Sequence, residues 1–276
     1  MSAPAARYPI SACIVAMDEE QRLGACLDAL DFCDEVLVVD SHSSDGTREL
    51  AAARGARVIE RDWPGHVAQK EFAIRAARHE WVLCVDADEV LSGPLRDEIL
   101  ALARAGLGTG GAAGYDFPRC TYYFGRWIRH GTWYPDRQLR LFDRRRGRWG
   151  GHDPHDRVEL VGPRASLSGE LLHWPYRELS EHLQTIDGYT TTMARGLFER
   201  GRRASAFDLW LRPLVRFLRF YVLKLGFLEG WRGLWLACVA AHYVRLKYAK
   251  LLLLQSPPPP PHRAAPGTEL SSRRAP

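Results

Sequence analysis

Short apolar runs alternate with helix-like segments in the first 86 residues of this chain. The runs are rich in Val, Ile and Leu, and they cover residues 10–16, 35–40, 57–60 and 81–86. Between them, apolar residues recur three or four positions apart, as Leu23, Leu27 and Leu30 do, which is the spacing of a helix. Strands that alternate with helices predict a parallel sheet with helices on both faces. The expected fold class is therefore α/β, doubly wound.

Acidic residues follow three of the four expected strands. Residues 18–20 come after the first strand, Asp40 ends the second, and residues 86–89 follow the fourth. Ligands of open parallel sheets bind outside the carboxyl ends of the strands. We therefore expect a binding site along this edge of the sheet.

Asp86 and Asp88 form the strongest local motif of the chain. Two carboxylates one residue apart, just past a buried strand, can hold a divalent cation that bridges to a nucleotide diphosphate. The alternative is a solvated turn, because this pair of residues is common by chance. Its place after the fourth strand favours the metal site.

A second polar segment runs from Asp40 to Thr47. Asp40, at the end of a buried strand, is expected to accept hydrogen bonds from a base or a ribose. The Ser, Gly and Thr residues that follow are typical of a helix start. Asp45 is therefore either a cap of that helix or a ligand.

The pattern changes after the Gly-rich segment 106–114, which is expected to be a linker or surface loop. Short strands are predicted around residues 115–119, 138–142 and 157–161, and Ser180 opens an amphipathic helix through Leu183, Ile186, Tyr189 and Met193. The expected organisation is a first half with the acidic strand ends, a second half of the same domain, a basic helical region and a Pro-rich disordered tail. Their ranges are 8–114, 115–200, 201–255 and 256–276.

The net charge of +5 conceals an uneven distribution. Residues 1–194 hold 23 Lys and Arg against 29 Asp and Glu, whereas residues 195–255 hold 12 against 3. The basic segment is also rich in Leu and Trp, which suits helices lying in the interface of an anionic membrane. Its longest uncharged stretch, 233–244, is shorter than the roughly 20 residues needed to span a bilayer.

The basic segment has two alternative roles. One is an amphipathic helical cap packed on the catalytic domain. The other is nucleic-acid binding, which we do not expect because the Arg residues are embedded in Leu and aromatic runs. The strand ends and the basic helices are expected to open toward the same membrane-facing side.

The six cysteines form no C-x-x-C pair and lie mostly in apolar runs, so they are expected to be buried thiols in a reducing compartment. Residues 1–9 contain no apolar stretch of signal-peptide length. The expected location is the cytoplasm, peripheral on the inner face of a membrane. The spacing of His130, His152, His155 and His173 fits no standard zinc site.

The ordered motifs resemble the inverting glycosyltransferases of family 2. In the first half, the resemblance is carried by residues 14–20, 38–47 and 86–89; in the second half, it is carried by residues 130–142, 154–159 and 172–176. The second set is similar to the bacterial enzymes that add a sugar to the inner core of lipopolysaccharide, in particular the β-glucosyltransferases that act on heptose. The resemblance implies a GT-A-like fold, a divalent metal (Mg²⁺ or Mn²⁺) and inversion at the anomeric carbon.

The resemblance also implies roles for individual residues. It places Asp40 at the uracil or ribose, and it places Asp86 and Asp88 together at the ribose, metal and diphosphate. Glu89 would support the metal or face the acceptor. The other residues expected to bind the nucleotide sugar are Asp18, Glu20, Arg137 and Arg140.

One element departs from the family pattern. Processive members carry Q-x-x-R-W, whereas this chain has Leu141 where that Trp would stand. The difference favours the transfer of a single sugar and leaves the role of Gln138 open.

An inverting transfer needs a base that takes the proton of the acceptor hydroxyl. Asp136 is the first candidate, because it lies in a short polar segment between aromatic residues and a strand; alternatively it pairs with Arg137 or Arg140. Asp156 is the second candidate, with His155 beside it on the acceptor side, and Asp116 is the third.

The sequence as a whole predicts transfer of one sugar, with UDP-glucose as the expected donor, to a lipid-linked, heptose-containing saccharide of the lipopolysaccharide core. The expected partners are the nucleotide sugar, this acceptor and an anionic membrane surface, without nucleic acid. Transfer to polyprenyl phosphate is one alternative. A non-catalytic adaptor is another, favoured if Asp86, Asp88 and Asp136 point away from a common pocket.

Overall fold

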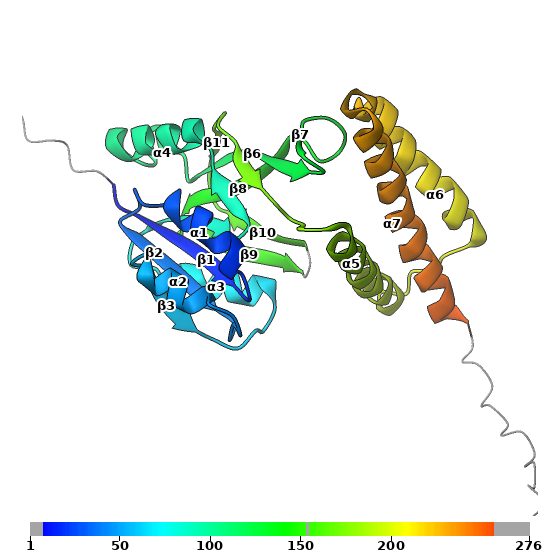
Figure 1. Ribbon diagram of the computed structural model, residues 1–276, viewed down its shortest axis with the longest axis horizontal. Coiled ribbons are helices and arrows are strands. Elements are labelled where there is room, and N and C mark those ends of the chain that lie inside the picture. Colours follow the sequence, from blue (N-terminus) through cyan, green and yellow to red (C-terminus); the bar gives the residue numbers. More distant parts are fainter. Residues whose placement is uncertain (1–7, 153–154, 257–276) are drawn as a thin grey trace, which may run out of the picture.

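The computed structural model describes residues 8–152 and 155–256, so the expected tail beyond Ser256 lies outside the described residues. The first half forms a parallel sheet in the order β3-β2-β1-β4 (Figure 1). Its strands and helices, in chain order, are β1 (Ile10–Ala16), α1 (Glu20–Asp28), β2 (Glu35–Asp40), α2 (Thr47–Ala53), β3 (Arg57–Glu60), α3 (His66–Ala76) and β4 (Trp81–Asp86). The predicted doubly wound alternation is confirmed.

The second half extends the same sheet. Strands are added beyond β4 in the order β8-β6-β12-β5, while β7 and β11 pair with β6 and β9 pairs with β10. The added elements are β5 (Glu89–Leu91), α4 (Gly93–Ala105), β6 (Gly114–Tyr123), β7 (Arg126–Ile128), β8 (Asp136–Asp143), β9 (Gly147–His152), β10 (His155–Leu160), β11 (Arg164–Ser166) and β12 (Leu171–His173). The three strands predicted in this half are all present.

The antiparallel pairing of β8 with β4 brings the second half to the expected site. Leu83 of β4 pairs with Leu141 of β8, and Trp81 pairs with Asp143. Because the two strands run in opposite directions, the start of β8 lies beside the end of β4. The residues around Arg140 therefore approach the carboxyl ends of the parallel strands.

Apolar side chains on both faces of the sheet hold its layers together. On one face, α1, α2 and α4 contribute Leu23, Ala51 and Ile99 to the core. On the other face, Ile74 of α3 and Trp149 of β9 pack against the sheet. The sheet is thus covered by helices on one side, and by α3 with the β9-β10 hairpin on the other.

Three long helices follow the sheet and stand to one side of it (Figure 1). They are α5 (Leu179–Glu199), α6 (Ala206–Leu218) and α7 (Trp231–Gln255), and two short helical turns, η2 (Arg219–Leu223) and η3 (Gly226–Glu229), join the last two. Helix α7 packs against both α5 and α6, and its Leu236 and Ala237 join a core with Tyr123 and Ile128 of the sheet. No helix in the described part of the chain is both long and apolar enough to cross a membrane.

Helix α5 begins within one residue of the predicted start, but it buries a different face. Leu183 and Tyr189 are exposed, while Ile186 and Ala194 are buried. The polar His182 is also buried. Its imidazole ring shares a hydrogen bond with the Tyr123 hydroxyl and stacks on the ring of Tyr176. Apolar spacing alone did not reveal this buried histidine.

Candidate active site

A cavity of about 970 Å³ opens at the carboxyl ends of β1 and β4. This is within the size range of small-molecule sites. Its polar lining residues come from both halves of the sheet and include Lys70, Asp86, Asp88, Arg119, Arg137, Arg140, Asp156 and His173. Asp86 and Asp88 thus share one pocket, while Asp136, the third residue named for the adaptor alternative, is not among its lining residues.

Asp86 is held between two cations. Its Oδ1 lies 2.8 Å from Lys70 Nζ, and its Oδ2 accepts a hydrogen bond of 2.8 Å from Arg140 Nη2. Burial alone would raise the pKa of Asp86, but Arg140 and Lys70 hold that pKa well below its ordinary value. Asp86 therefore remains a carboxylate and fixes both cations at the cavity wall.

Trp149 supports the same two cations from the β9-β10 hairpin. Lys70 Nζ lies 4.7 Å from the centre of the Trp149 ring, and the Arg140 guanidinium lies 5.5 Å from it. The face of an indole ring attracts cations. The hairpin therefore helps to keep both positive charges in the cavity.

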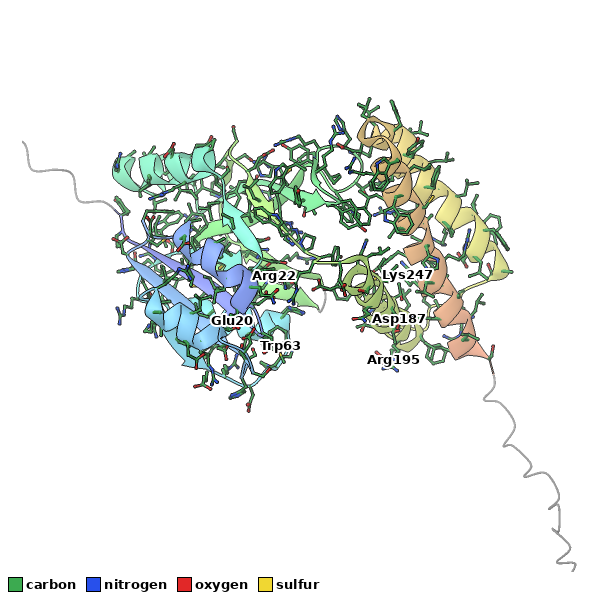
Figure 2. The ribbon with its side chains drawn as sticks, viewed as in Figure 1. Glu20, Arg22, Trp63, Asp187, Arg195 and Lys247 are labelled. Carbon is green, nitrogen blue, oxygen red and sulfur yellow. The ribbon has the colours of Figure 1, made fainter. Side chains whose placement is uncertain are left out.

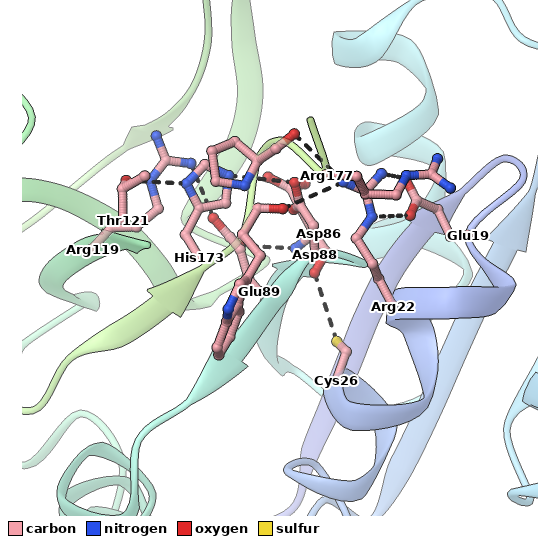
Figure 3. Close-up of polar contacts among 12 residues, drawn as sticks. Glu19, Arg22, Cys26, Asp86, Asp88, Glu89, Arg119, Thr121, His173 and Arg177 are labelled. Carbon is pink, nitrogen blue, oxygen red and sulfur yellow. Dashed lines mark hydrogen bonds and ion pairs between the residues drawn. The ribbon is translucent and has the colours of Figure 1, made fainter. Parts of the chain in front are cut away.

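Asp88 has a different environment. Its Oδ2 lies 3.4 Å from Nε2 of His173, and its backbone carbonyl accepts a hydrogen bond from Trp174 (Figure 3). The Asp88 carboxylate lines the cavity. Within the described residues, no Lys or Arg forms an ion pair with it. The geometry favours Asp88 over Asp86 as the carboxylate for a cation, because both oxygens of Asp86 already contact cationic groups.

The donor set around Asp88 fits Mg²⁺ or Mn²⁺ in part. These ions take carboxylate oxygens and are commonly held by one or two carboxylates, with the phosphates of a substrate completing the shell. His173 is near enough to be a second protein donor. Among the described residues, no group of three or more His, Cys, Asp and Glu side chains could hold a metal ion.

Glu89 lies beneath the cavity and is fully buried. It accepts hydrogen bonds from the backbone N–H of Asp86 at 2.9 Å and from Arg119 Nη1 at 3.0 Å, and it lies 3.3 Å from Arg140 Nη2. It is not among the residues that line the cavity. The structure thus gives Glu89 the geometry of an anchor for two arginines.

The three candidate bases occupy different positions. Asp136 is bound by Arg119 at 2.6 Å and by Gln138 at 2.8 Å, and it is outside the set of residues that line the cavity. Its ion-pair partner is Arg119, and neither Arg137 nor Arg140 takes that place. Asp156 does line the cavity, where Lys70 donates a hydrogen bond of 2.9 Å to its Oδ2.

Asp116, the third candidate, is buried and also outside the cavity lining. Arg137 and Arg164 both pair with it. The geometry therefore changes the order of the candidates and places Asp156 first. The side chain of His155 lies outside the described part of the chain; its backbone opens β10.

The acidic residues expected around the nucleotide organise the loop between β2 and α2. Asp18 accepts a hydrogen bond from the backbone of Ser44 at 2.7 Å, Glu20 from Gly46 at 3.1 Å, and Asp40 from Ser43 at 2.9 Å. None of the three is among the cavity-lining residues. Their nucleotide contacts stay predictions.

The Asp45 carboxylate accepts hydrogen bonds from the backbone N–H groups of Glu20 and Thr47, at the starts of α1 and α2. These two contacts agree with the helix-cap alternative.

The two predicted phosphate-binding arginines both line the cavity. Arg140 is almost completely buried, whereas Arg137 is partly exposed and is held by Asp116 and by the carbonyl oxygen of Leu167 at 2.8 Å. Together with Lys70, they are three of the six Lys and Arg side chains that line the cavity. Such groups can bind a diphosphate.

Lys70 was not predicted from the sequence, although a signal was present. It stands three and four residues before Ala73 and Ile74, so it falls on the apolar face of α3, and all three residues are buried. A lysine is rarely buried unless it has partners. Asp86 and Asp156 are those partners, and they raise the pKa of Lys70 although burial acts in the opposite direction.

We expect Lys70→Met to destabilise the protein by about 3 kcal/mol, because removal of one member of a buried ion pair leaves an uncompensated charge. Urea denaturation followed by circular dichroism measures the change. Arg75→Met is the matched control on the same helix, since Arg75 is exposed and its pair with Glu71 is worth at most about 1 kcal/mol. Equal losses for the two variants would contradict a special role of Lys70.

Known proteins resemble this chain over most of its length. The chain matches the family model described as glycosyl transferase family 2 over residues 11–158, which is more than half of its length. It is 30% identical over 252 residues to the lipopolysaccharide core biosynthesis glycosyltransferase LpsC of Rhizobium meliloti (strain 1021), a match that covers 89% of this chain and 92% of the relative. An uncharacterized glycosyltransferase of Rickettsia typhi is 28% identical, with 88% of this chain and 86% of the relative covered.

Solved structures also match. One is a glucosyl-3-phosphoglycerate synthase from Mycobacterium tuberculosis, solved in complex with Mn²⁺, uridine diphosphate and glucosyl-3-phosphoglycerate. It is 24% identical to this chain, with a TM-score of 0.33. The match covers 42% of this chain and 44% of that one. A fragment of S. aureus TarS is 14% identical over 88% of this chain and 89% of that one, with a TM-score of 0.43. On the strength of the family model and of the relationship to LpsC, the chain belongs to glycosyltransferase family 2.

Proposed function

We propose that this protein transfers a single sugar from a nucleotide sugar, UDP-glucose in the first instance, to a heptose-containing saccharide of the lipopolysaccharide core, with inversion at the anomeric carbon. One observation carries the proposal: Asp88, Asp156 and six Lys and Arg side chains line the same cavity at the strand ends. The relationship to LpsC supports the class of acceptor.

Asp88, with His173 beside it, is proposed to hold the divalent cation. When bound, that cation supplies positive charge to the leaving diphosphate. Arg140, Arg137 and Lys70 supply further positive charge from the protein, fixed before the reaction by Asp86, Asp116 and Asp156. Preorganised charge of this kind lowers the barrier because little reorganisation is needed during the reaction.

Asp156 is proposed to be the base. In the transfer, an oxygen of the acceptor forms a bond to the anomeric carbon while the bond from that carbon to the diphosphate oxygen breaks. The proton of the acceptor hydroxyl passes to the Asp156 carboxylate, and the electron pair of the broken bond leaves with the nucleoside diphosphate. Lys70 orients the base through its 2.9 Å hydrogen bond.

A thermal-shift screen of UDP-, GDP- and ADP-sugars, each with and without Mn²⁺ or Mg²⁺, tests this function. We expect a UDP-sugar with metal to raise Tm by several degrees, because a ligand that binds only the folded state stabilises it. Failure of every nucleotide sugar to shift Tm in the presence of either metal would contradict the proposal.

The C-terminal helices are proposed to lie on the anionic membrane that carries the acceptor. Of the 22 large apolar side chains that are exposed in the described part of the chain, 15 belong to residues 207–254. Trp210, Leu223 and Trp231 are among the most exposed of these between α6 and the start of α7, with exposed fractions of 69%, 75% and 60%. A patch of this kind marks an interaction surface, and the net positive charge of the segment matches anionic lipid.

Helix α5 connects this surface to the cavity. Its Thr185 and Tyr189 line the cavity, and α7 packs on its other side. The arrangement supports the expectation that the cavity and the basic helices serve the same membrane face.

We expect the purified protein to float with vesicles of phosphatidylglycerol and phosphatidylethanolamine. The double variant Leu223→Glu and Trp231→Glu should bind them at least about tenfold more weakly, since each apolar side chain contributes about 1.5–3 kcal/mol when buried. Val161→Glu is the matched control, because Val161 is 75% exposed but directly follows β10, away from the three C-terminal helices in the chain. Co-sedimentation and flotation measure the binding, and equal binding by all three proteins would contradict this surface.

A further inference from the structure

One wall of the cavity carries neutral hydroxyl groups instead of charges. Tyr176, Thr185 and Tyr189 line the cavity together with Asp156. Tyr176 precedes α5, and the other two hydroxyl-bearing residues lie one turn apart on the same face of that helix. Figure 2 shows α5 standing between the sheet and α7. Because α5, which is described over its whole length, places no charged side chain in the cavity lining, this wall differs from the cationic wall formed by α3 and β8.

The two tyrosine hydroxyls are available to a ligand. In the described part of the chain, neither Tyr176 nor Tyr189 forms a hydrogen bond through its hydroxyl with another residue. A tyrosine hydroxyl can donate one hydrogen bond and accept another. The Thr185 hydroxyl donates to the backbone carbonyl of Glu181 at 2.9 Å, and its oxygen can still accept. This wall can therefore both donate hydrogen bonds to a ligand and accept them from it.

The electrostatic environment places Tyr189 near the proposed base. Burial raises the pKa of Tyr189; among the charged groups, Asp156 has the largest effect and raises it further, while Lys70 lowers it. Burial also raises the pKa of Tyr176, and Tyr189 is the largest contributor among the neighbouring groups. Electrostatic effects of this kind weaken with distance. A sugar whose hydroxyl reaches Asp156 would therefore lie against both tyrosines.

Tyr176 is held in place by the core beneath the C-terminal helices. Its ring stacks on the imidazole of His182, with the ring centres 4.2 Å apart and the ring planes inclined by 20°. The imidazole shares a hydrogen bond of 2.7 Å with the Tyr123 hydroxyl, to which Trp235 of α7 also donates at 3.3 Å. The ring is thus fixed before a ligand arrives, which reduces the entropy cost of binding.

We propose that Tyr176, Thr185 and Tyr189 form the subsite for the acceptor sugar and orient its reacting hydroxyl toward Asp156. Neutral hydroxyls and aromatic ring faces suit the hydroxyl groups and C–H surfaces of a saccharide, whereas the cations of the opposite wall suit the diphosphate of the donor. This inference rests on the proposed function and deepens it, because it assigns the acceptor to one wall of the cavity.

Tyr176→Phe and Tyr189→Phe test the subsite, since each keeps the ring and removes only the hydroxyl. We expect each variant to raise KM for lipopolysaccharide core saccharide by about three- to tenfold, the loss expected for one neutral hydrogen bond. KM for UDP-glucose should stay as in the wild type. Calorimetric titration of the saccharide into protein with UDP and Mn²⁺ should give the same ratio of acceptor affinities without transfer.

Tyr243→Phe is the matched control. Tyr243 lies on α7, outside the cavity lining, and its hydroxyl donates to the sulfur of Met193 at 2.8 Å. We expect this variant to bind the acceptor as the wild type does. An equal rise of acceptor KM in all three variants would overturn the subsite.

Two further outcomes would also overturn it while leaving the proposed function standing. One is unchanged acceptor affinity in both Tyr176→Phe and Tyr189→Phe, in a wild type that transfers sugar. The other is a rise of KM for UDP-glucose alone, which would assign this wall to the donor. Absence of UDP-sugar binding by the wild type would contradict the proposed function instead, and titration of the saccharide without UDP would then decide the subsite by the same ratio.

Discussion

Asp156→Asn is expected to lower kcat by about 10²–10⁴-fold, because a positioned base contributes that much to a proton transfer. The amide has the shape of the carboxylate but cannot accept the proton of the acceptor hydroxyl. Lys70 keeps its second partner, Asp86, at 2.8 Å in this variant, so the cavity should remain folded. Steady-state kinetics with a saturating nucleotide sugar measure the change.

Asp136→Asn is the matched control for this prediction. Asp136 lies outside the cavity lining and is engaged by Arg119 and Gln138, so we expect kcat to fall by less than about tenfold, which corresponds to 1.4 kcal/mol. The reverse result, a large loss for Asp136→Asn with Asp156→Asn nearly unchanged, would make Asp136 the base.

Asp88→Asn is expected to lower kcat by about 10²–10³-fold, the range observed when one group that stabilises developing negative charge is removed. The same variant should lose the effect of Mn²⁺ on UDP-sugar binding, because the neutral amide is a weaker ligand for a hard cation than a carboxylate. Calorimetric titration of UDP with and without metal measures this loss. A metal effect of unchanged size in Asp88→Asn would contradict the assignment.

Asp97→Asn provides a matched control for charge alone. Asp97 is an exposed residue of α4 and lies outside the cavity lining. We expect this variant to keep the wild-type metal dependence. An equal loss in both variants would mean that net charge, and not a ligand at Asp88, controls the binding.

The parallel half of the fold was predictable because its information is local. Each strand from β1 to β4 is a short apolar run, and the helices between them carry apolar residues at helical spacing. The place of Asp88 at the cavity was predictable for the same reason, since it directly follows a buried strand. No knowledge of distant contacts was needed for either.

The choice between Asp136 and Asp156 depended on contacts that are distant in sequence. Asp136 is paired with Arg119, 17 residues away in the sequence. Asp156 lines the cavity and is paired with Lys70, 86 residues away. The position of β10 relative to α3 follows from how the second half folds back over the sheet. No local pattern in residues 130–160 contains that information.

The carboxylates near the cavity, all within the acidic segment 1–194, differ in whether a cationic side chain pairs with them. Asp86 and Glu89 are paired with cationic side chains of the chain itself. Asp88 is the exception that faces the cavity without a Lys or Arg partner in the described residues. Metal binding is therefore expected to concern this one carboxylate above all.

Sugar transfer itself is the measurement that tests the account most directly. Purified protein is incubated with UDP-glucose labelled in the sugar, Mn²⁺ and lipopolysaccharide core saccharide as acceptor, and the product is analysed by NMR. The account predicts that label enters the acceptor through a bond of β configuration from the α-linked donor, and that a chelator abolishes the transfer. Retention of the α configuration, or transfer of unchanged rate after removal of the metal, would contradict it.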